Sequence, residues 1–370
     1  MKSSSNATMT RRGFVATLGG SLGAAFLAGC AGKQDQAAST DSQAGTTQES
    51  GTPASEGIDY MVLVNKWHKL PDNWEDVVSI VEFKNTEGWG VQVEAKAYDA
   101  YLAMKGELSQ EGVFVDLDSA YRDVKEQQRI VDDFTKKYGA EYVKQYVAVP
   151  GYSEHHTGLA LDLFLIIDGK GVYENEDMVT YPEIWEKIHA KLADHGFILR
   201  YLPQRKIFTG GSYEPWHIRY LDDPEVAHQI MDAGLTFEEY LNQVEPIVAG
   251  CEVDYGNSKL YEDTDIDRAL DAILAEFGTW KGCTLKRFAF TSDEQCTQNL
   301  AYANELRAAN MPDIPAFDQA IVLATDFHSP SEEEAKGTAW EPDTDYYDWT
   351  WTLGRTGADG MWQLVGWGMG

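Results

Sequence analysis

The stretch Ser153–Asp162, which reads SEHHTGLALD, contains two histidines and ends in the carboxylate of Asp162, directly before the apolar run LFLII at 163–167. An apolar run of this kind predicts a buried strand. A carboxylate at the head of such a strand is costly to bury unless a cation or hydrogen-bond donors compensate its charge. The segment Glu214–His217, EPWH, adds another carboxylate and another histidine. Together the two segments predict a metal site.

The candidate ligands of that site are His155, Asp162 and His217, and none of them is a thiolate. A catalytic zinc ion has about three protein ligands and one open position, whereas a structural zinc ion usually has four ligands, often cysteines. Glu214 comes shortly before His217, and Pro215 between them restricts the local backbone. The Glu214 carboxylate is therefore expected beside the metal as a general base, which predicts metal-assisted hydrolysis of an amide bond.

Arg122 is the candidate for binding the charge of the substrate. It follows the alternating segment Val113–Leu117, a predicted strand, and precedes the predicted helix Asp123–Tyr138. A guanidinium at this junction is suited to hold a substrate carboxylate or a developing oxyanion, because it offers a planar fork of donors.

Three motifs follow one another along the chain: Ser119–Arg122 with Gln127, the pattern Ser-x-His-x-x-Gly-x-Ala-x-Asp that begins at Ser153, and Tyr213–His217. In residue types, order and spacing they resemble the motifs of the VanY-type D-alanyl-D-alanine carboxypeptidases. The resemblance extends from about Tyr60 to Val244. It implies a zinc enzyme that removes the terminal D-alanine from peptidoglycan stem peptides.

Carried over by position, the resemblance implies one zinc ion per chain, held by His155, Asp162 and His217. It implies that Glu214 is the catalytic base and that the substrate is bound by Arg122, Gln127 and Ser153. The chain departs from the family pattern at Ala120, where a glycine is usual, and at Asp123, where a serine is frequent. Neither departure removes a metal ligand.

Residues 1–30 predict export. Thr10–Val15 forms a twin-arginine pattern ahead of a weakly hydrophobic run that is too short for a membrane span. The run ends in Leu27–Cys30, LAGC, which resembles the lipobox of bacterial lipoproteins. Residues 31–56 are small and polar and are predicted to form a disordered tether. The expected product is a lipoprotein anchored through Cys30 to the outer face of the bacterial cytoplasmic membrane; the alternative is a signal cleaved nearby without lipidation.

The zinc D,D-carboxypeptidase domain is expected at 57–246, as an α+β fold with helices around a small antiparallel sheet. Its ordered structure is predicted to begin with a strand at Tyr60–Val64. Two later strands, Phe197–Leu202 and Trp216–Leu221, are expected to be joined through the turn-rich segment Thr209–Ser212. Helices are predicted at Ala95–Gly106, Asp123–Tyr138, Tyr181–His195 and, broken at Gly234, within 223–243.

Residues 247–370 are expected to form a smaller C-terminal α+β domain of unknown role. Helices are predicted at Thr264–Phe277 and Ser292–Asn310, strands at Cys283–Thr291 and Ala320–Asp326, and a hairpin at Trp349–Arg355 and Met361–Gly368. Apart from Cys30 the chain has three cysteines, Cys251, Cys283 and Cys296. They allow at most one disulfide among themselves, and Cys283 with Cys296 is the preferred pair.

The formal net charge of −30 argues against nucleic acid as a partner, because the chain has no basic stripe to neutralise phosphates. The acidic excess is most simply a solvated surface. The tryptophans Trp349, Trp351, Trp362 and Trp367 are expected in a core rather than on a carbohydrate platform. Structural roles are predicted for the remaining histidines, His68, His156, His189, His195, His228 and His328.

Two other functions stay open at this point. The same zinc core also suits an L,D-carboxypeptidase, a dipeptidase or an endopeptidase on cell-wall peptides, because that choice depends on pocket walls outside the motifs. A non-catalytic wall-binding lipoprotein with a structural zinc ion is the alternative of a different class. Glu214 argues against it, since a structural site has no use for a general base.

Overall fold

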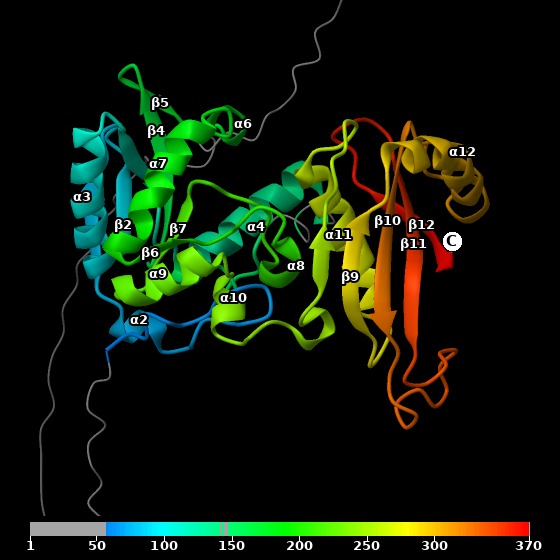
Figure 1. The fold of residues 1–370 in the computed structure, drawn as a ribbon. Helices are drawn as coiled ribbons and strands as arrows, with labels where there is room; N and C mark the ends of the chain where they lie inside the picture. Colours follow the sequence, from blue (N-terminus) through cyan, green and yellow to red (C-terminus); the bar gives the residue numbers. More distant parts are fainter. Residues whose placement is uncertain (1–56, 141–142, 144–146, 370) are drawn as a thin grey trace, which may run out of the picture.

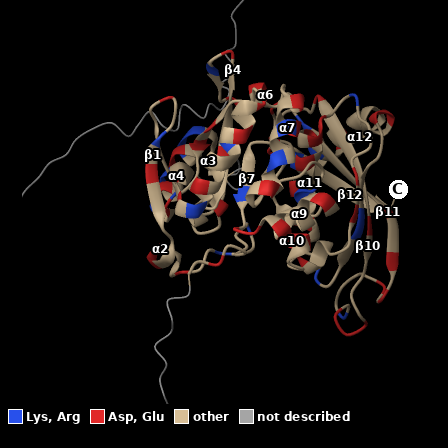
Figure 2. Ribbon diagram, turned by 60° about the vertical axis from the view of Figure 1, so that its left-hand side comes forward, with Lys and Arg blue, Asp and Glu red and all other residues tan. Residues whose placement is uncertain are grey.

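The computed structural model describes residues 57–140, 143 and 147–369, which form two five-stranded β-sheets, a two-stranded hairpin and their helices (Figure 1). The predicted signal at 1–30, with Cys30, and the predicted tether at 31–56 lie outside the described residues. Within the described residues, no helix is both long enough and apolar enough to cross a membrane. Acidic residues are spread over helices and strands around both of these sheets (Figure 2), in keeping with the net charge of −30.

The first sheet has five strands in the order β3-β4-β7-β6, with β5 paired to β4, and all its pairings are antiparallel. Its strands are β3 Val115–Ser119, β4 Ala160–Ile167, β5 Lys170–Val172, β6 Phe197–Leu199 and β7 His217–Tyr220. A separate antiparallel hairpin consists of β1 Ile80–Lys84 and β2 Gly90–Glu94. The predicted α+β fold around a small antiparallel sheet is confirmed.

Helices surround the first sheet, and local signals explain several of their ends. The long helix α3 buries Ala97, Tyr101, Met104 and Leu108, which fall on one helical face. Gly196 ends the segment after α7 in the left-handed conformation that favours glycine. The helices are α2 Trp74–Val77, α3 Ala95–Gln110, α4 Val124–Tyr138, η1 Glu154–Thr157, α6 Asn175–Met178, α7 Pro182–Leu192, η2 Ala193–His195, α8 Lys206–Thr209, α9 Pro224–Ala233 and α10 Phe237–Tyr240.

The second sheet has five strands in the order β12-β11-β10-β9-β8, of which β8 runs parallel to β9. Residues of α11 pack with Ile321 and Leu323, whereas Ala303 of α12 packs with Ala320. Neighbouring residues of a strand point to opposite faces, so the two helices cover opposite faces of this sheet. Its elements are η3 Pro246–Val248, β8 Glu252–Asp254, α11 Asp263–Phe277, β9 Thr284–Phe290, α12 Asp293–Asn310, β10 Gln319–His328, β11 Asp345–Arg355 and β12 Gln363–Met369.

Most predicted helices and strands are present with ends shifted by a few residues, but the strand at Tyr60–Val64 is wrong. These residues form a turn and irregular backbone. The carbonyl oxygens of Tyr60 and Val62 accept hydrogen bonds from the guanidinium of Arg219, each at 2.9 Å, instead of pairing with a neighbouring strand. In this apolar run, backbone carbonyls that would pair in a strand bond to a buried arginine side chain.

The predicted disulfide between Cys283 and Cys296 is also wrong. Both thiols are free and buried, and Cys251 is free as well. Strand β9 separates the pair, and seven residues of extended chain at about 3.3 Å each span roughly 20 Å, far beyond the reach of a disulfide. The Cys296 sulfur instead accepts a hydrogen bond from the Val322 amide at 3.3 Å.

Candidate active site

The register of the first sheet brings two predicted ligands together. Asp162 on β4 lies directly opposite His217 on β7. Residues opposite each other in an antiparallel pair point to the same face with their Cβ atoms about 5 Å apart. Asp162 Oδ1 accordingly lies 3.0 Å from His217 Nδ1.

The third predicted ligand, His155, comes from the short helix η1 directly before β4. Gly158 ends η1 with φ 72°, and a Cβ atom there would lie 3.0 Å from the side chain of Ile80 and 3.2 Å from the Glu94 amide nitrogen. Glycine is therefore required at this position, both for its backbone angle and for the close approach. The turn brings His155 Nε2 to 3.3 Å from Asp162 Oδ2.

The hydrogen bonds of the two histidines determine which nitrogen faces the site. His155 Nδ1 donates to the Ala120 carbonyl oxygen at 2.7 Å, which leaves Nε2 toward Asp162. His217 Nε2 donates to Glu154 Oε2 at 3.1 Å, which leaves Nδ1 toward Asp162. Ligating histidines commonly hold their orientation through such a bond from the second nitrogen. Ligand atoms of His155, Asp162 and His217 all lie within 4.8 Å of one another.

These three side chains fit a zinc ion. Burial lowers the pKa of His155, so its ring is neutral and an Nε2 lone pair faces a carboxylate oxygen. Two acceptors that face each other at 3.3 Å call for a cation between them. Burial opposes protonation of His217, but its hydrogen bonds to Asp162 and Glu154 raise the pKa of that ring to about 9. A proton or a metal ion is thus favoured on Nδ1, and two histidines with one carboxylate are a common donor set of catalytic zinc.

Glu214 lies beside the ligands but is more open to solvent. Its Oε2 is 3.8 Å from His217 Nδ1, and its side chain is 38% exposed against 4% for His217. A turn closed by the hydrogen bond from the His217 amide to the Glu214 carbonyl, at 3.2 Å, places the two residues next to each other. The position suits a base that exchanges protons with water and substrate without being a ligand.

Arg122 is held at the edge of the site by its neighbours. Its Nη1 donates to Gln127 Oε1 at 2.9 Å, and its backbone amide donates to the His155 carbonyl at 3.1 Å. Gln127 is buried, and its amide nitrogen donates to the Ala148 carbonyl at 2.7 Å. Ser153 is buried at the N-terminal cap of η1. The hydrogen bond to Gln127 fixes the orientation of the Arg122 guanidinium, whose charge acts on His155. Substrate contacts of Arg122, Gln127 and Ser153 stay predictions.

The other histidines have structural partners, in keeping with the prediction. His156 is the clearest case, because its Nδ1 donates to the Arg122 carbonyl at 2.6 Å and its Nε2 accepts from the Gly151 amide at 3.0 Å. It thereby ties η1 to the segment that carries Arg122. Partners of the remaining ones are Asn65 for His68, Pro215 for His189, Glu107 for His195, Asp194 for His228 and Asp345 for His328.

Comparison with known proteins adds the family. The model of the family VanY, described as D-alanyl-D-alanine carboxypeptidase, matches residues 90–223. The putative carboxypeptidase YodJ of Bacillus subtilis strain 168 is 34% identical over 191 residues, which are 50% of this chain and 68% of that protein. The bifunctional D-Ala-D-Ala dipeptidase and D-Ala-D-Ala carboxypeptidase VanXYC of Enterococcus gallinarum is 35% identical over 184 residues, 48% of this chain and 91% of its own length. The chain belongs to the VanY family.

Membership of the VanY family confirms the resemblance seen in the motifs. A solved structure of VanYB in complex with D-alanine-D-alanine is 29% identical, with a TM-score of 0.41, and covers 50% of this chain and 99% of that one. The family model ends at residue 223, before the C-terminal domain begins.

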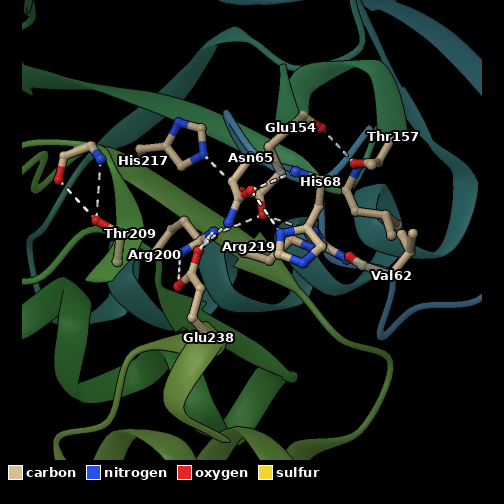
Figure 3. A network of polar contacts seen from close by, with 12 residues as sticks. Val62, Asn65, His68, Glu154, Thr157, Arg200, Thr209, His217, Arg219 and Glu238 are labelled. Carbon is tan, nitrogen blue, oxygen red and sulfur yellow. Dashed lines mark hydrogen bonds and ion pairs between the residues drawn. The ribbon is translucent and has the colours of Figure 1, made fainter. Parts of the chain in front are cut away.

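A buried ionic network that the sequence did not reveal lies beneath the candidate metal ligands (Figure 3). Glu154 Oε1 accepts from Arg200 Nε at 2.8 Å and from Arg219 Nη1 at 2.9 Å, and its Oε2 accepts from His217. Arg200 also forms a two-bond pair with Glu238, at 2.6 and 3.0 Å. Burial alone would raise the pKa of the Glu154 carboxyl, but Arg200 and Arg219 hold it well below its usual range.

One signal for this network was present in the sequence. Arg219 is two residues after His217, and alternate residues of a strand share a face. If His217 faces the site, Arg219 lies on the same face of the strand, and a guanidinium buried there needs a carboxylate as its partner. Glu154, between Ser153 and His155, was the nearest one in the motif. Nothing in the local sequence pointed to Glu238.

Proposed function

We propose that this chain is a zinc-dependent D-alanyl-D-alanine carboxypeptidase that removes the terminal D-alanine from peptidoglycan stem peptides. One observation carries the proposal: ligand atoms of His155, Asp162 and His217 converge, with the Glu214 carboxylate next to them. The activities of the related protein VanXYC of Enterococcus gallinarum, D-Ala-D-Ala dipeptidase and D-Ala-D-Ala carboxypeptidase, support the substrate class.

A bound zinc ion would supply a Lewis acid that polarises the scissile carbonyl and acidifies water. Glu214 accepts the proton of the attacking water and delivers it to the nitrogen of the leaving D-alanine. Arg122 binds the terminal carboxylate of the peptide, since its forked guanidinium matches a carboxylate and Gln127 fixes its orientation. Glu154 holds the proton on His217 Nε2 and so keeps Nδ1 toward the site.

We further propose that the protein is exported and anchored by a lipid on Cys30, with 31–56 as a tether. The support is the twin-arginine pattern at Thr10–Val15 and the LAGC sequence that ends in Cys30. Expression of the full chain in a bacterium tests this. Wild type is expected in the membrane fraction with a mature N-terminus at Cys30, and a Cys30→Ala variant outside that fraction.

The activity test uses purified protein and a stem pentapeptide ending in D-Ala-D-Ala. We expect release of D-alanine, loss of release with a chelator, and recovery with added zinc. A Glu214→Gln variant is expected to bind zinc normally and to lose about 10²- to 10⁴-fold in kcat. An active Glu214→Gln variant would remove the assigned mechanism.

The same assay separates the alternatives. Mass spectrometry of products from a tetrapeptide stem reports an L,D-carboxypeptidase, and free D-Ala-D-Ala as substrate reports a dipeptidase. A cross-linked stem dimer reports an endopeptidase. Zinc-loaded protein that cleaves none of these peptides but binds cell wall would instead favour the non-catalytic reading.

A further inference from the structure

The residues that connect β6 to β7 form a loop, here called the Glu214 loop, at 200–216. It carries the proposed base near its C-terminal end. The helix α8, at Lys206–Thr209, lies in the middle of the loop and is buried along its whole length. A loop that holds a catalytic group usually lies on the surface. The Glu214 loop is instead buried at α8, so another part of the chain must cover it.

The C-terminal domain covers the Glu214 loop. Ile207 and Phe208 of α8 are 0% and 3% exposed, and they belong to the hydrophobic core that includes Ile266, Leu270 and Phe277 of α11. In Figure 1, α8 lies on the side of the first sheet that faces α11. Two apolar side chains of the catalytic loop are thus part of the core of the second domain.

An ion pair strengthens this attachment. Lys206 Nζ lies 2.8 Å from Asp271 Oδ2 of α11, and the side chains are 6% and 14% exposed. The same Nζ donates to the Ser212 hydroxyl at 3.2 Å. Ser212 is also hydrogen bonded to Asp267, one turn before Asp271 on α11. Both ends of the central loop segment are therefore held by one helix of the C-terminal domain.

The attachment continues from Ser212 to the proposed site. Gly211 lies against the Tyr201 ring, where an added Cβ would come within 2.5 Å of a ring carbon. The Tyr201 ring packs on the His217 ring with centroids 4.9 Å apart, and its carbonyl accepts from the Glu214 amide at 3.4 Å. A shift of the loop at Ser212 would accordingly move Glu214 relative to the ligand His217.

We infer that Lys206 and Asp271 are positioning residues, through which the C-terminal domain holds the Glu214 loop in the geometry that catalysis needs. The catalytic half of this inference rests on the proposed function. The anchoring half rests only on the contacts between α8 and α11. The C-terminal domain, whose role the sequence left open, is then part of the catalytic unit.

The chemistry of a buried ion pair gives a sharp test. Removal of one partner leaves an excess charge buried, whereas replacement of both by apolar groups of similar size is often tolerated. Lys66 and Asp267 also act electrostatically on this pair, so Asp271→Asn leaves two lysines against one carboxylate, while loss of both Lys206 and Asp271 leaves one of each. We therefore expect Asp271→Asn to make the Glu214 loop more mobile, and the double variant Lys206→Met/Asp271→Leu to restore its attachment to α11. Arg287→Met serves as the control, since the Arg287 side chain is 36% exposed and its ion pairs with Asp326 and Asp348, at 3.9 and 3.5 Å, lie within the C-terminal domain.

Two readouts on the full zinc-loaded chain are needed. Hydrogen–deuterium exchange of peptides that cover 203–214 should be faster in Asp271→Asn, and wild-type-like in the double variant and the control. The kcat for the pentapeptide should fall about 10- to 100-fold in Asp271→Asn, since small misplacements of a catalytic group have effects of this size. KM and zinc content should stay unchanged, and the double variant should recover kcat.

Each outcome decides one half of the inference. Unchanged exchange in Asp271→Asn would overturn the anchoring, and faster exchange with unchanged kcat would overturn the link to catalysis. Wild type without activity on any stem peptide would refute the proposed function, while the exchange data would still decide the anchoring. If Asp271→Asn does not fold, Ser212→Ala, which removes one hydroxyl, gives the same two readouts with smaller expected changes.

Discussion

The two sheets of this protein bury different kinds of side chain. Beneath the first sheet lie two carboxylates and two guanidiniums, Glu154, Glu238, Arg200 and Arg219, all of them buried. The core of the second sheet instead contains aromatic rings that contact one another, among them Phe277, Trp280, Phe327, Trp340 and Trp351. The first sheet thus adds a buried charge network to a large apolar core of its own, whereas the second sheet packs on a cluster of tryptophan and phenylalanine rings.

This difference matches what each sheet has to do. Buried ions lose their hydration, and their mutual attraction often only offsets that loss, so a network of this kind is a poor source of stability. It does constrain geometry, because Glu154 accepts hydrogen bonds from Arg200, Arg219 and His217 at the same time. Aromatic pairs contribute about 0.5–1.5 kcal/mol each beyond their buried area. We expect the first sheet to be optimised for orientation and the second for stability.

Glu154→Ala should give the largest effect, because it affects both stability and the site. It removes the carboxylate that pairs with Arg219, and a broken buried pair typically costs about 3–5 kcal/mol in the free energy of unfolding. Loss of the bond to His217 Nε2 should lower zinc affinity by about 10- to 100-fold. Urea denaturation and competition with a metal indicator measure the two quantities.

Glu238→Gln is the matched control for this comparison. Glu238 belongs to the same network but contacts Arg200 and Asn65, not His217. It should destabilise the protein and leave zinc affinity within about 2-fold of wild type, because the His217 orientation is kept. Equal losses of zinc affinity in both variants would show that the network acts through global stability rather than through His217.

Trp351→Phe tests the other sheet and should have a smaller effect. Trp351 is fully buried, and its ring stacks on the Trp280 ring with centroids 5.1 Å apart. Its Nε1 donates a hydrogen bond to the Thr325 hydroxyl at 2.9 Å. The variant leaves that hydroxyl buried without its donor, which costs about 1–3 kcal/mol. Zinc affinity should not change. Adding Thr325→Val should recover part of the lost stability, and a failure to do so would assign the loss to ring packing alone.

The sequence was sufficient to predict what depends on local pattern. The helix Asp263–Phe277 repeats apolar residues at helical spacing, and the ligands at His155 and Asp162 lie in one short motif. Their meeting with His217 depends on the register of β4 and β7. The residue types of the two segments suggested this meeting, and the resemblance to a family supported it, but neither predicted the register.

The features that were missed depend on contacts between distant segments. The bond from Arg219 to the Tyr60 carbonyl replaced a predicted strand, and it joins residues far apart in the chain. The attachment of α8 to α11 also joins distant segments, because the sequence around Lys206 contains no signal that Asp271 is its partner. Short strands such as β8 Glu252–Asp254 were also missed, since three residues carry too little periodicity to be recognised.

The smallest effect is expected from the thiols of the second domain, because no disulfide should contribute to the stability of that domain. Burial raises the pKa of Cys251 to about 12 and the pKa of Cys283 and Cys296 to about 11. Only the thiolate reacts, so native protein at pH 8 should alkylate slowly at these three positions and rapidly after urea is added. Reductant should leave the urea midpoint unchanged. Mass spectrometry of the cysteine peptides measures the labelling, and a midpoint lowered by reductant would mean that a disulfide supports this aromatic core after all.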